Sequence, residues 1–194
     1  MKEFIFHESY LKGAYLIEPF YAGDSRGGFT KIFEKAVYEN NNVDFVLSET
    51  FMSKSAKNVM RGLHFQFHHP QAKIISVIEG KVWDVIVDLR KGSDTFKCYQ
   101  TVELSAANRY GLFVPRGFAH GFVSLEDDSI MLYQCDGEYD VTSDSGIRFD
   151  EPELGINWPI EDGIAIHSER DLNLHHWNSY CRYIEEHKID LFGT

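Results

Sequence analysis

The sequence predicts an all-β domain, a β-barrel or jelly roll with short helices at its edges. Two observations favour this class: paired runs rich in Ile and Val across residues 73–93, and further short apolar runs that recur after them at turn-separated intervals. Such spacing is typical of antiparallel sandwiches and barrels. Helical patterns are confined to residues 30–40 and to about residues 168–188.

The two runs within residues 73–93 are joined at Glu79-Gly80, which predicts a β-hairpin. Both faces of both runs are largely apolar, so we expect a sheet that is covered on both sides. Later strands are expected over residues 98–105, 111–115, 120–125 and 129–135, with breaks at residues 106–108, 115–117 and 126–128.

Length and composition predict a single domain over residues 1–194. The chain is 43% hydrophobic, which is enough for a core of ordinary size, and it has no linker-like tract and no repeat. The first residues, MKEFIFHESYLKG, lack the apolar core of a signal peptide. No stretch approaches the about 18 uncharged residues that a membrane span needs, so we expect a cytosolic protein.

Charge and cysteine content argue against three further classes of protein. A formal net charge of -11 disfavours nucleic-acid binding, which depends on a basic surface or stripe. Cys98, Cys135 and Cys181 are odd in number and form no C-x-x-C motif. They therefore predict neither a disulfide framework nor a thiolate zinc site.

A histidine-rich segment, RGLHFQFHHP at residues 61–70, raises the possibility of a metal site. VPRGFAH at residues 114–120 fits the P-x-G-x-x-H pattern that closes the metal site of a cupin barrel. The upstream half of that pattern requires H-x-H and a glutamate, whereas this chain has H-F-Q from His64 onward and then Lys73. An ammonium group repels a dication and glutamine is a poor substitute for imidazole, so no metal is expected.

The same residues suit proton transfer. Strand alternation places His64 and Gln66 on one face, and we expect His64 and Lys73 to project from adjacent strands into one pocket, flanked by Arg61 and His120. A base beside a cation suits removal of a proton α to a carbonyl, because the cation stabilises the enolate oxygen. The alternative for His64 is a core histidine, but an apolar core would then desolvate several polar groups without benefit.

Several linked motifs resemble the dTDP-4-dehydrorhamnose 3,5-epimerase family of cupin-fold enzymes. They are RGLHFQ, the run beginning at Lys73, VDLRKGSDTF, VELSAANRYGLFVPRGFAHGF and DEPELGINWPI, and the resemblance covers about residues 10–172. It implies a cupin-type jelly-roll β-barrel, a homodimer and a carboxyl-terminal extension at residues 173–194 that is a peripheral helix or a dimer contact. It also implies cofactor-independent epimerisation of a nucleotide-activated 4-keto-6-deoxyhexose, dTDP-4-dehydro-6-deoxy-D-glucose, to dTDP-4-dehydro-L-rhamnose.

The resemblance further implies roles for individual residues. His64 matches the base that removes a proton from C3 or C5, and Asp171 matches the aspartate that pairs with it. Lys73 matches the lysine that stabilises the enolate at O4, and Tyr133 matches the tyrosine that reprotonates the opposite face. The residues implied in substrate binding are Arg26, Glu49, Arg61, His120, Asp144 and Arg170, whose arginines would hold the diphosphate.

The chain departs from the family pattern only in positions that concern recognition. Lys31 replaces a glutamate, Phe51 an asparagine, Glu138 a tyrosine and Arg170 a lysine. These changes leave open an epimerase of C3 alone or C5 alone, or one for a different nucleotide sugar. Two alternatives belong to other functional classes: a non-catalytic sugar-binding cupin and a metal-dependent cupin enzyme.

Two of the catalytic assignments have ordinary structural alternatives. Tyr133 alone would be a core tyrosine with its hydroxyl at the rim. Asp171 alone would be a helix cap or a surface charge.

Overall fold

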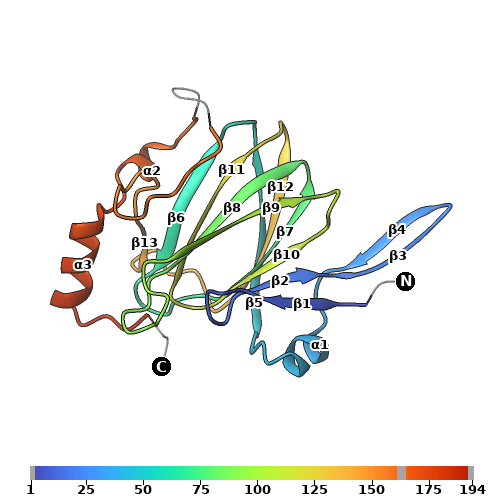
Figure 1. Ribbon diagram of the computed structural model, residues 1–194, viewed down its shortest axis with the longest axis horizontal. Coiled ribbons are helices and arrows are strands. Elements are labelled where there is room, and N and C mark those ends of the chain that lie inside the picture. The colour runs from blue at the N-terminus through green and yellow to red at the C-terminus, as the bar shows by residue number, and fades with distance from the viewer. Residues whose placement is uncertain (1–2, 161–164, 192–194) are drawn as a thin grey trace.

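Two antiparallel sheets pack face to face in this computed structural model, which describes residues 3–160 and 165–191 (Figure 1). The six-stranded sheet has the order β1 (Ile5–Glu8), β2 (Tyr15–Glu18), β10 (Gly111–Val114), β7 (Lys73–Glu79), β12 (Ser129–Asp136) and β5 (Leu47–Ser55). The five-stranded sheet has the order β13 (Asp144–Gly146), β6 (Met60–Gln66), β11 (Phe118–Ser124), β8 (Lys81–Asp88) and β9 (Tyr99–Ser105). The predicted all-β class is therefore confirmed.

A separate hairpin of β3 (Phe20–Asp24) and β4 (Gly27–Lys31) extends away from both sheets (Figure 1). The helices are short: α1 (Lys35–Asn40), α2 (Glu169–Leu172) and α3 (Trp177–Glu186). The helix expected over residues 30–40 begins later, because its first residues belong to β4. The carboxyl-terminal helical region is divided into α2 and α3. No helix in the described residues is long and apolar enough to cross a membrane.

The hairpin expected at Glu79-Gly80 was wrong. β7 pairs with β10 and β12, whereas β8 pairs with β11 and β9, so the two strands lie in opposite sheets. Gly80 has a φ of +73°, and a side chain there would collide with Ser129. The chain turns a corner between the layers at this glycine, which a Cβ atom would disfavour. Apolar residues on both faces fit two strands in facing layers as well as they fit a hairpin.

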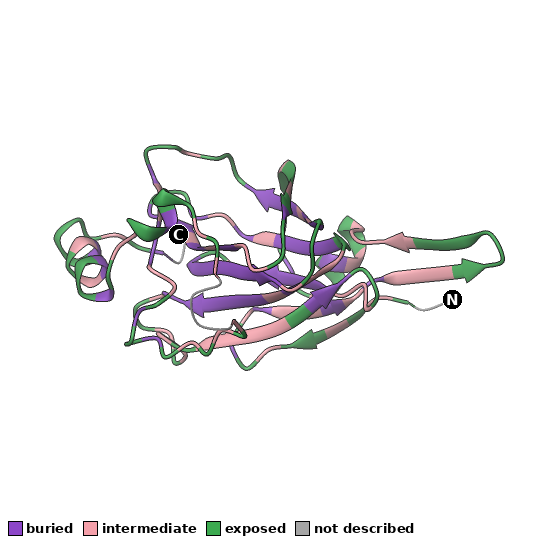
Figure 2. Ribbon diagram, turned by 90° about the horizontal axis from the view of Figure 1, so that it is seen from above, coloured by how far each residue is buried: buried purple, intermediate pink, exposed green. Residues whose placement is uncertain are grey.

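Strand alternation produces one core between the sheets and one on each outer face. The core between the sheets includes Ile75, Val77, Val82, Ile86, Phe122 and Met131. Leu63 and Phe65 of β6 point the other way and pack with Trp177 and Tyr180 of α3. A third cluster lies between the six-stranded sheet and α1 and includes Ile17, Tyr38 and Ile74. Figure 2 shows these buried central strands in purple and the largely exposed hairpin in green and pink.

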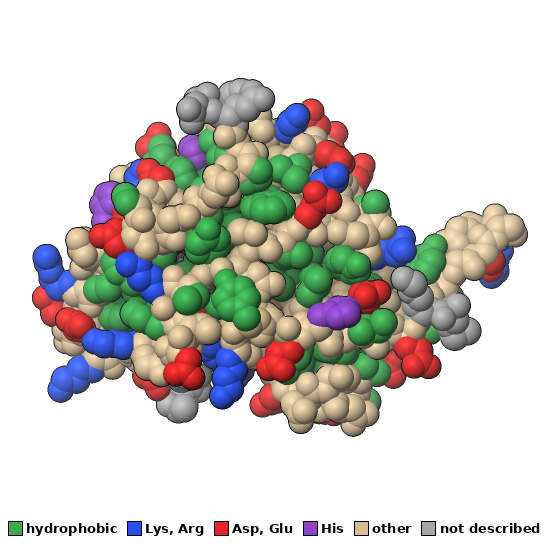
Figure 3. Space-filling model, in the orientation of Figure 1, with side chains coloured by type: hydrophobic (Ala, Val, Ile, Leu, Met, Phe, Trp, Pro, Cys, Tyr) green, Lys and Arg blue, Asp and Glu red, His purple; other side chains and the backbone are tan. Residues whose placement is uncertain are grey.

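Charged side chains of both signs are interspersed over the face of the molecule seen in Figure 3, and the β3–β4 hairpin stands clear of the body there. Several of the residues that the sequence singled out lie instead on the facing strands of the two sheets: His64 and His120 on one sheet, and Glu49, Lys73 and Tyr133 on the other.

Candidate active site

His64 and Asp171 form a close pair although they are far apart in sequence. The bridge between Val59 and Ile166 runs the carboxyl-terminal segment beside the start of β6, and Ile166 exchanges backbone hydrogen bonds with Asn58 and Met60. α2 follows this segment directly and places Asp171 Oδ1 2.6 Å from His64 Nε2. The carboxyl-terminal segment therefore reaches the central site, as the pairing of these residues requires.

Asp171 is held by a second set of contacts. Its backbone N–H donates to the hydroxyl of Ser168, the N-cap of α2, at 3.0 Å, and the same hydroxyl donates to Oδ2 at 2.7 Å. The Gly62 N–H lies 3.4 Å from Oδ1. Burial acts to raise the pKa of Asp171, but the hydrogen bonds from His64 and Ser168 outweigh it and hold the pKa at about 2. The side chain is thus a carboxylate at neutral pH and not a solvated surface charge.

The carboxylate determines which nitrogen of His64 is basic. An acceptor at Nε2 keeps the proton there, so Nδ1 carries the free lone pair of the neutral ring. Burial lowers the pKa of His64 below the usual 6.5, while Asp171 opposes that shift and the Arg170 and Lys73 charges reinforce it. His64 is therefore neutral at pH 7 and able to accept a proton.

Lys73 lies on the facing sheet and not on a strand adjacent to β6, which corrects that expectation. It is the Cα partner of Cys135, which in turn is the partner of Glu49, so the three side chains share one face. Burial lowers the pKa of the Lys73 ammonium, and the charges of Asp144 and Glu49 act against that shift. The Cys135 thiol is also buried, which raises its pKa to about 11.

Tyr133 lies on the same inner face as Lys73, two residues along β12 from Cys135. Only 7% of the residue is exposed. Burial raises the pKa of its phenol, and the Ser53 hydroxyl and the Arg61 charge oppose that effect only in part. The phenol is therefore protonated at any pH where the protein would work, which is what a proton donor requires.

His120 is the Cα partner of His64 on the neighbouring strand β11. It is buried, and its Nε2 lies 2.8 Å from Oδ2 of Asp84, a fully buried carboxylate on β8. The Asp84 Oδ1 atom is buried without a hydrogen-bond partner among the described residues. Sequence reasoning missed Asp84, although an aspartate inside the apolar run VWDVIVD was a usable signal, because a charge in such a run needs a partner.

Arg170 lies between His64 and a second carboxylate, that of Asp144. Its Nη2 donates to Asp144 Oδ2 at 2.6 Å, and its Nη1 lies 3.3 Å from His64 Nε2. The Tyr139 hydroxyl donates to the same Asp144 oxygen at 3.0 Å.

Arg61, at the start of β6, donates to the Ser55 hydroxyl at 3.2 Å and to the Lys54 carbonyl at 3.3 Å. Two arginines and a tyrosine hydroxyl therefore lie close to His64 and to the strands β5 and β13.

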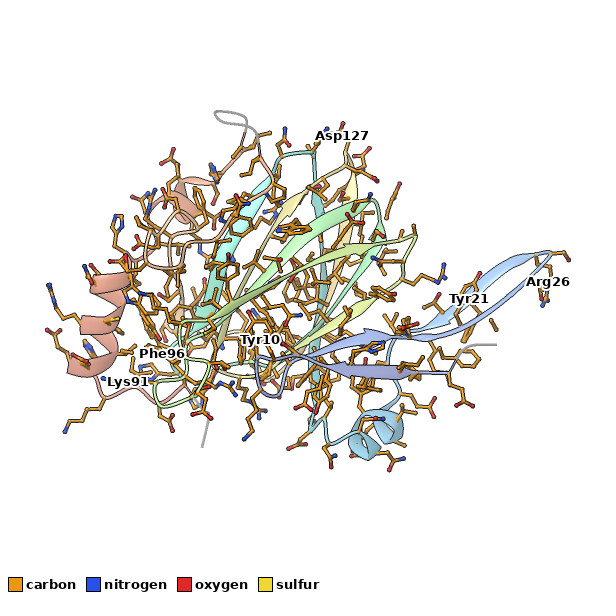
Figure 4. The ribbon with its side chains drawn as sticks, viewed as in Figure 1. Tyr10, Tyr21, Arg26, Lys91, Phe96 and Asp127 are labelled. Carbon is orange, nitrogen blue, oxygen red and sulfur yellow. The ribbon has the colours of Figure 1, made fainter. Side chains whose placement is uncertain are left out.

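Arg26 alone among the predicted site residues lies away from this group. It is near the tip of the β3–β4 hairpin, which projects from the body, and Figure 4 labels it there. Its Nη2 is 2.5 Å from Asp24 Oδ2, and 88% of its side chain is exposed. Tyr21, on the same hairpin, packs against the Arg109 guanidinium at 4.1 Å. Within one chain, Arg26 does not contact the site.

The donor set does not resemble a metal centre. His64 and His120 each direct Nε2 at a carboxylate, and Lys73 is an ammonium on the facing sheet. Across residues 3–160 and 165–191, no three His, Cys, Asp or Glu side chains gather closely enough to hold a metal ion. His68 and His69 are exposed in the loop after β6.

Comparisons of the sequence with a family profile and with individual proteins point to the same family. The sequence profile of the family described as dTDP-4-dehydrorhamnose 3,5-epimerase matches residues 8–179. A dTDP-4-dehydrorhamnose 3,5-epimerase from Methanothermobacter thermautotrophicus is 45% identical over 175 residues, which are 89% of this chain and 94% of that protein.

Two solved structures are similar to this chain over about nine-tenths of its length. The dTDP-4-dehydrorhamnose 3,5-epimerase of Bacillus anthracis, with TDP and PPi bound, is 40% identical with a TM-score of 0.86 and covers 90% of this chain and 99% of that one. The dTDP-6-deoxy-D-glucose-3,5-epimerase of Legionella pneumophila, in complex with dTDP-4-keto-L-rhamnose, is 34% identical with a TM-score of 0.87 and covers 91% of this chain and 94% of that one.

Proposed function

This chain belongs to the dTDP-4-dehydrorhamnose 3,5-epimerase family of cupin-type folds, and we propose that it converts dTDP-4-dehydro-6-deoxy-D-glucose into dTDP-4-dehydro-L-rhamnose without a cofactor. The observation that carries the proposal is the placement of a neutral histidine on one sheet and a protonated tyrosine on the facing sheet. Inversion of a carbon requires a base on one side of the sugar ring and an acid on the other.

The first step is removal of a proton. Nδ1 of His64 takes the proton from the carbon next to the C4 ketone, and the C–H electron pair forms an enolate with its charge on O4. The Lys73 ammonium stabilises this oxygen, and its burial strengthens that interaction because little water screens it. Asp171 stabilises the imidazolium that forms on His64.

The second step inverts the carbon. The Tyr133 hydroxyl donates its proton to the opposite face of the enolate carbon, which restores the ketone and leaves a phenolate. The cycle closes when His64 loses its proton and Tyr133 regains one from solvent. The same steps at C3 and at C5 invert both centres, and neither step needs an oxidant or a metal.

The remaining predicted residues bind the substrate in this proposal. Arg61 and Arg170 hold the diphosphate, since a guanidinium can donate to two oxygens at once. Glu49, His120 and Asp144 border the sugar. Asp144 and Arg170 already contact one another, so the arginine would exchange a carboxylate for a phosphate when the nucleotide binds.

Deuterium exchange tests the function directly. The protein is incubated with dTDP-4-keto-6-deoxyglucose in D2O and the sugar protons are followed by NMR. We expect exchange and inversion at both C3 and C5. Exchange with no inversion at either centre would contradict the proposal, and absence of all exchange would favour a binding protein or another substrate.

A narrower second candidate is an epimerase of one centre or of another nucleotide sugar. Phe51 stacks on Tyr133 and the Glu138 carbonyl accepts from Gln66, at positions where the family pattern has an asparagine and a tyrosine. Lys31 pairs with Glu34 instead of being a glutamate. In the same NMR experiment, deuterium at only one of the two carbons would select the single-centre enzyme. Faster turnover of the same sugar carried on a different nucleotide than of the dTDP sugar would identify an epimerase of another nucleotide sugar.

We further propose a cytosolic, single-domain chain that works as a homodimer, in which the hairpin of one subunit brings Arg26 to the site of the other. The exposed, projecting hairpin supports this arrangement, because Arg26 cannot meet the other site residues within its own chain. A mixture of Arg26→Ala and His64→Asn chains tests it. In a random equimolar mixture, about a quarter of all sites would combine an intact His64 from one subunit with an intact Arg26 from the other. Activity at low substrate should therefore rise above that of either variant alone. No rise on mixing would contradict the proposal.

A further inference from the structure

Phe51 lies against the proposed acid. It sits on β5, the edge strand of the six-stranded sheet, and is the Cα partner of Tyr133 on β12. Directly opposed residues of antiparallel strands project on the same face, so both rings point toward the space between the sheets. The rings are stacked, with centroids 4.7 Å apart and planes 14° from parallel.

The other side of Tyr133 is also occupied. The His120 ring meets it edge-on, with a centroid distance of 6.0 Å and an interplanar angle of 73°. His120 is itself fixed by the buried Asp84 carboxylate. Tyr133 is therefore confined between the His120 ring, which its contact with Asp84 fixes from within, and the Phe51 ring on the edge strand.

The two stacked rings differ in their exposure. Phe51 is 46% exposed, whereas Tyr133 is 7% exposed. Because β5 is the last strand of the sheet, Phe51 covers the face of the phenol ring that is turned toward that edge. The family pattern has an asparagine here, which could donate a hydrogen bond but could not cover an aromatic ring in this way.

We propose that Phe51 is a positioning residue, which holds Tyr133 against the sugar and keeps water from its ring, so that the proton is delivered to the face opposite His64. The inference rests on the proposed function. It names a residue that acts through Tyr133 and takes no proton itself.

The consequence concerns the fate of the enolate. Once His64 has taken the proton, the carbon can receive one from Tyr133, which inverts it, or from the imidazolium, which restores the original configuration. If His64 exchanges its proton with D2O first, the second route gives deuterium without inversion. Loosening Tyr133 slows only the first route, so the ratio of exchange to inversion reports its position.

Two variants test this role, Phe51→Ala and Phe51→Leu, of which leucine keeps an apolar cover but no ring. We expect the ratio of exchange to inversion to rise about 2–10-fold in Phe51→Ala, the range that one aromatic contact supplies, and less in Phe51→Leu. Met52→Ala is the matched control, because Met52 neighbours Phe51 but projects from the opposite face and is 66% exposed. Its ratio should equal that of the wild type.

A second readout needs no substrate. The ionisation of Tyr133, followed by NMR with Tyr133→Phe to assign its signal, should occur at lower pH in Phe51→Ala than in the wild type. An unchanged ratio together with unchanged ionisation would overturn the inference, as would a raised KM with an unchanged ratio, which would make Phe51 a contact for the substrate only. Failure of the proposed function is distinct, since the wild type would then show neither exchange nor inversion.

Discussion

His64 Nε2 lies 2.6 Å from Asp171 Oδ1, and 107 residues of sequence separate the two side chains. The contact joins a strand of the five-stranded sheet to a short helix near the carboxyl end. It fixes the ring nitrogen that carries the proton, and so decides which nitrogen can act as a base.

Replacing Asp171 by asparagine should remove most of the activity. The amide keeps the size of the side chain but can neither stabilise an imidazolium nor hold the Nε2–H tautomer. We expect the rate of exchange to fall by about 10²–10⁴-fold, with little change in the affinity for dTDP. Glu169→Gln, on the exposed neighbour in α2, is the control and should retain wild-type exchange. Equal rates for Asp171→Asn and the wild type would exclude the pairing from catalysis.

The same carboxylate should stabilise the fold in a pH-dependent manner. Its pKa is about 2 in the folded protein and near 3.8 in the unfolded chain, so the contribution is complete above about pH 5 and is lost as pH falls through 2. The difference corresponds to about 2 kcal/mol. Urea unfolding of the wild type and Asp171→Asn should therefore converge on acidification. A gap between the two proteins that stayed constant down to pH 3 would contradict this assignment.

Activity should rise with pH through the pKa of His64. Since burial lowers that pKa below 6.5, we expect the midpoint of the acidic limb of kcat/KM for exchange below pH 6.5. Arg170→Gln removes a cation 3.3 Å from Nε2, so the midpoint should move to higher pH. A midpoint above 6.5 in the wild type, or no movement in the variant, would mean that His64 is not the titrating base.

Lys73→Met should abolish the stabilisation of the enolate while keeping an apolar chain of similar length. We expect a loss of about 10²–10³-fold in exchange at both carbons. In the wild type, an alkaline limb should appear below pH 10.5, because burial lowers the pKa of the Lys73 ammonium and its neutral form cannot stabilise O4. Lys35→Met, on an exposed helix face, serves as the control. Retention of more than half of the wild-type rate in Lys73→Met would rule out its role.

Gly62→Ala should destabilise the protein around His64. Gly62 has a φ of +118°, and a Cβ atom there would lie 2.6 Å from Gly121 Cα and 2.8 Å from the His120 carbonyl oxygen. Conformational strain and collision with backbone together should cost about 2–4 kcal/mol in the free energy of unfolding. Gly92→Ala separates the two causes, because Gly92 has a φ of +100° with no atom within 4 Å of such a Cβ. If both variants lost the same stability, the close approach of β6 and β11 would not matter.

Sequence patterns predicted the side chains better than the layers. Alternation placed His64 on the inner face correctly, because Leu63 and Phe65 needed an apolar partner, which α3 supplies. The turn at Gly80 was misassigned, since a glycine between two apolar runs fits a hairpin and a corner equally well. The strands before residue 60 were not anticipated; β5, for example, is largely polar and exposed along LSETFMSKS.

The approach of Asp171 to the site could be inferred from family resemblance but not from local pattern. It depends on the bridge between Val59 and Ile166, which is set by tertiary packing. Asp84 was visible as a charge within an apolar strand, yet its partner His120 could be named only once β8 and β11 were known to be neighbours.

The division of His64 and Tyr133 between two layers has a consequence for substrate choice. Packed sheets lie about 10 Å apart, so in the proposed mechanism the sugar ring must lie between the layers and reach both side chains. A ketosugar that binds but lies closer to β6 would lose and regain its proton without changing configuration. The thickness of the sandwich would thus act as a stereochemical filter, and sugars that fail to span it would emerge labelled with deuterium but otherwise unaltered.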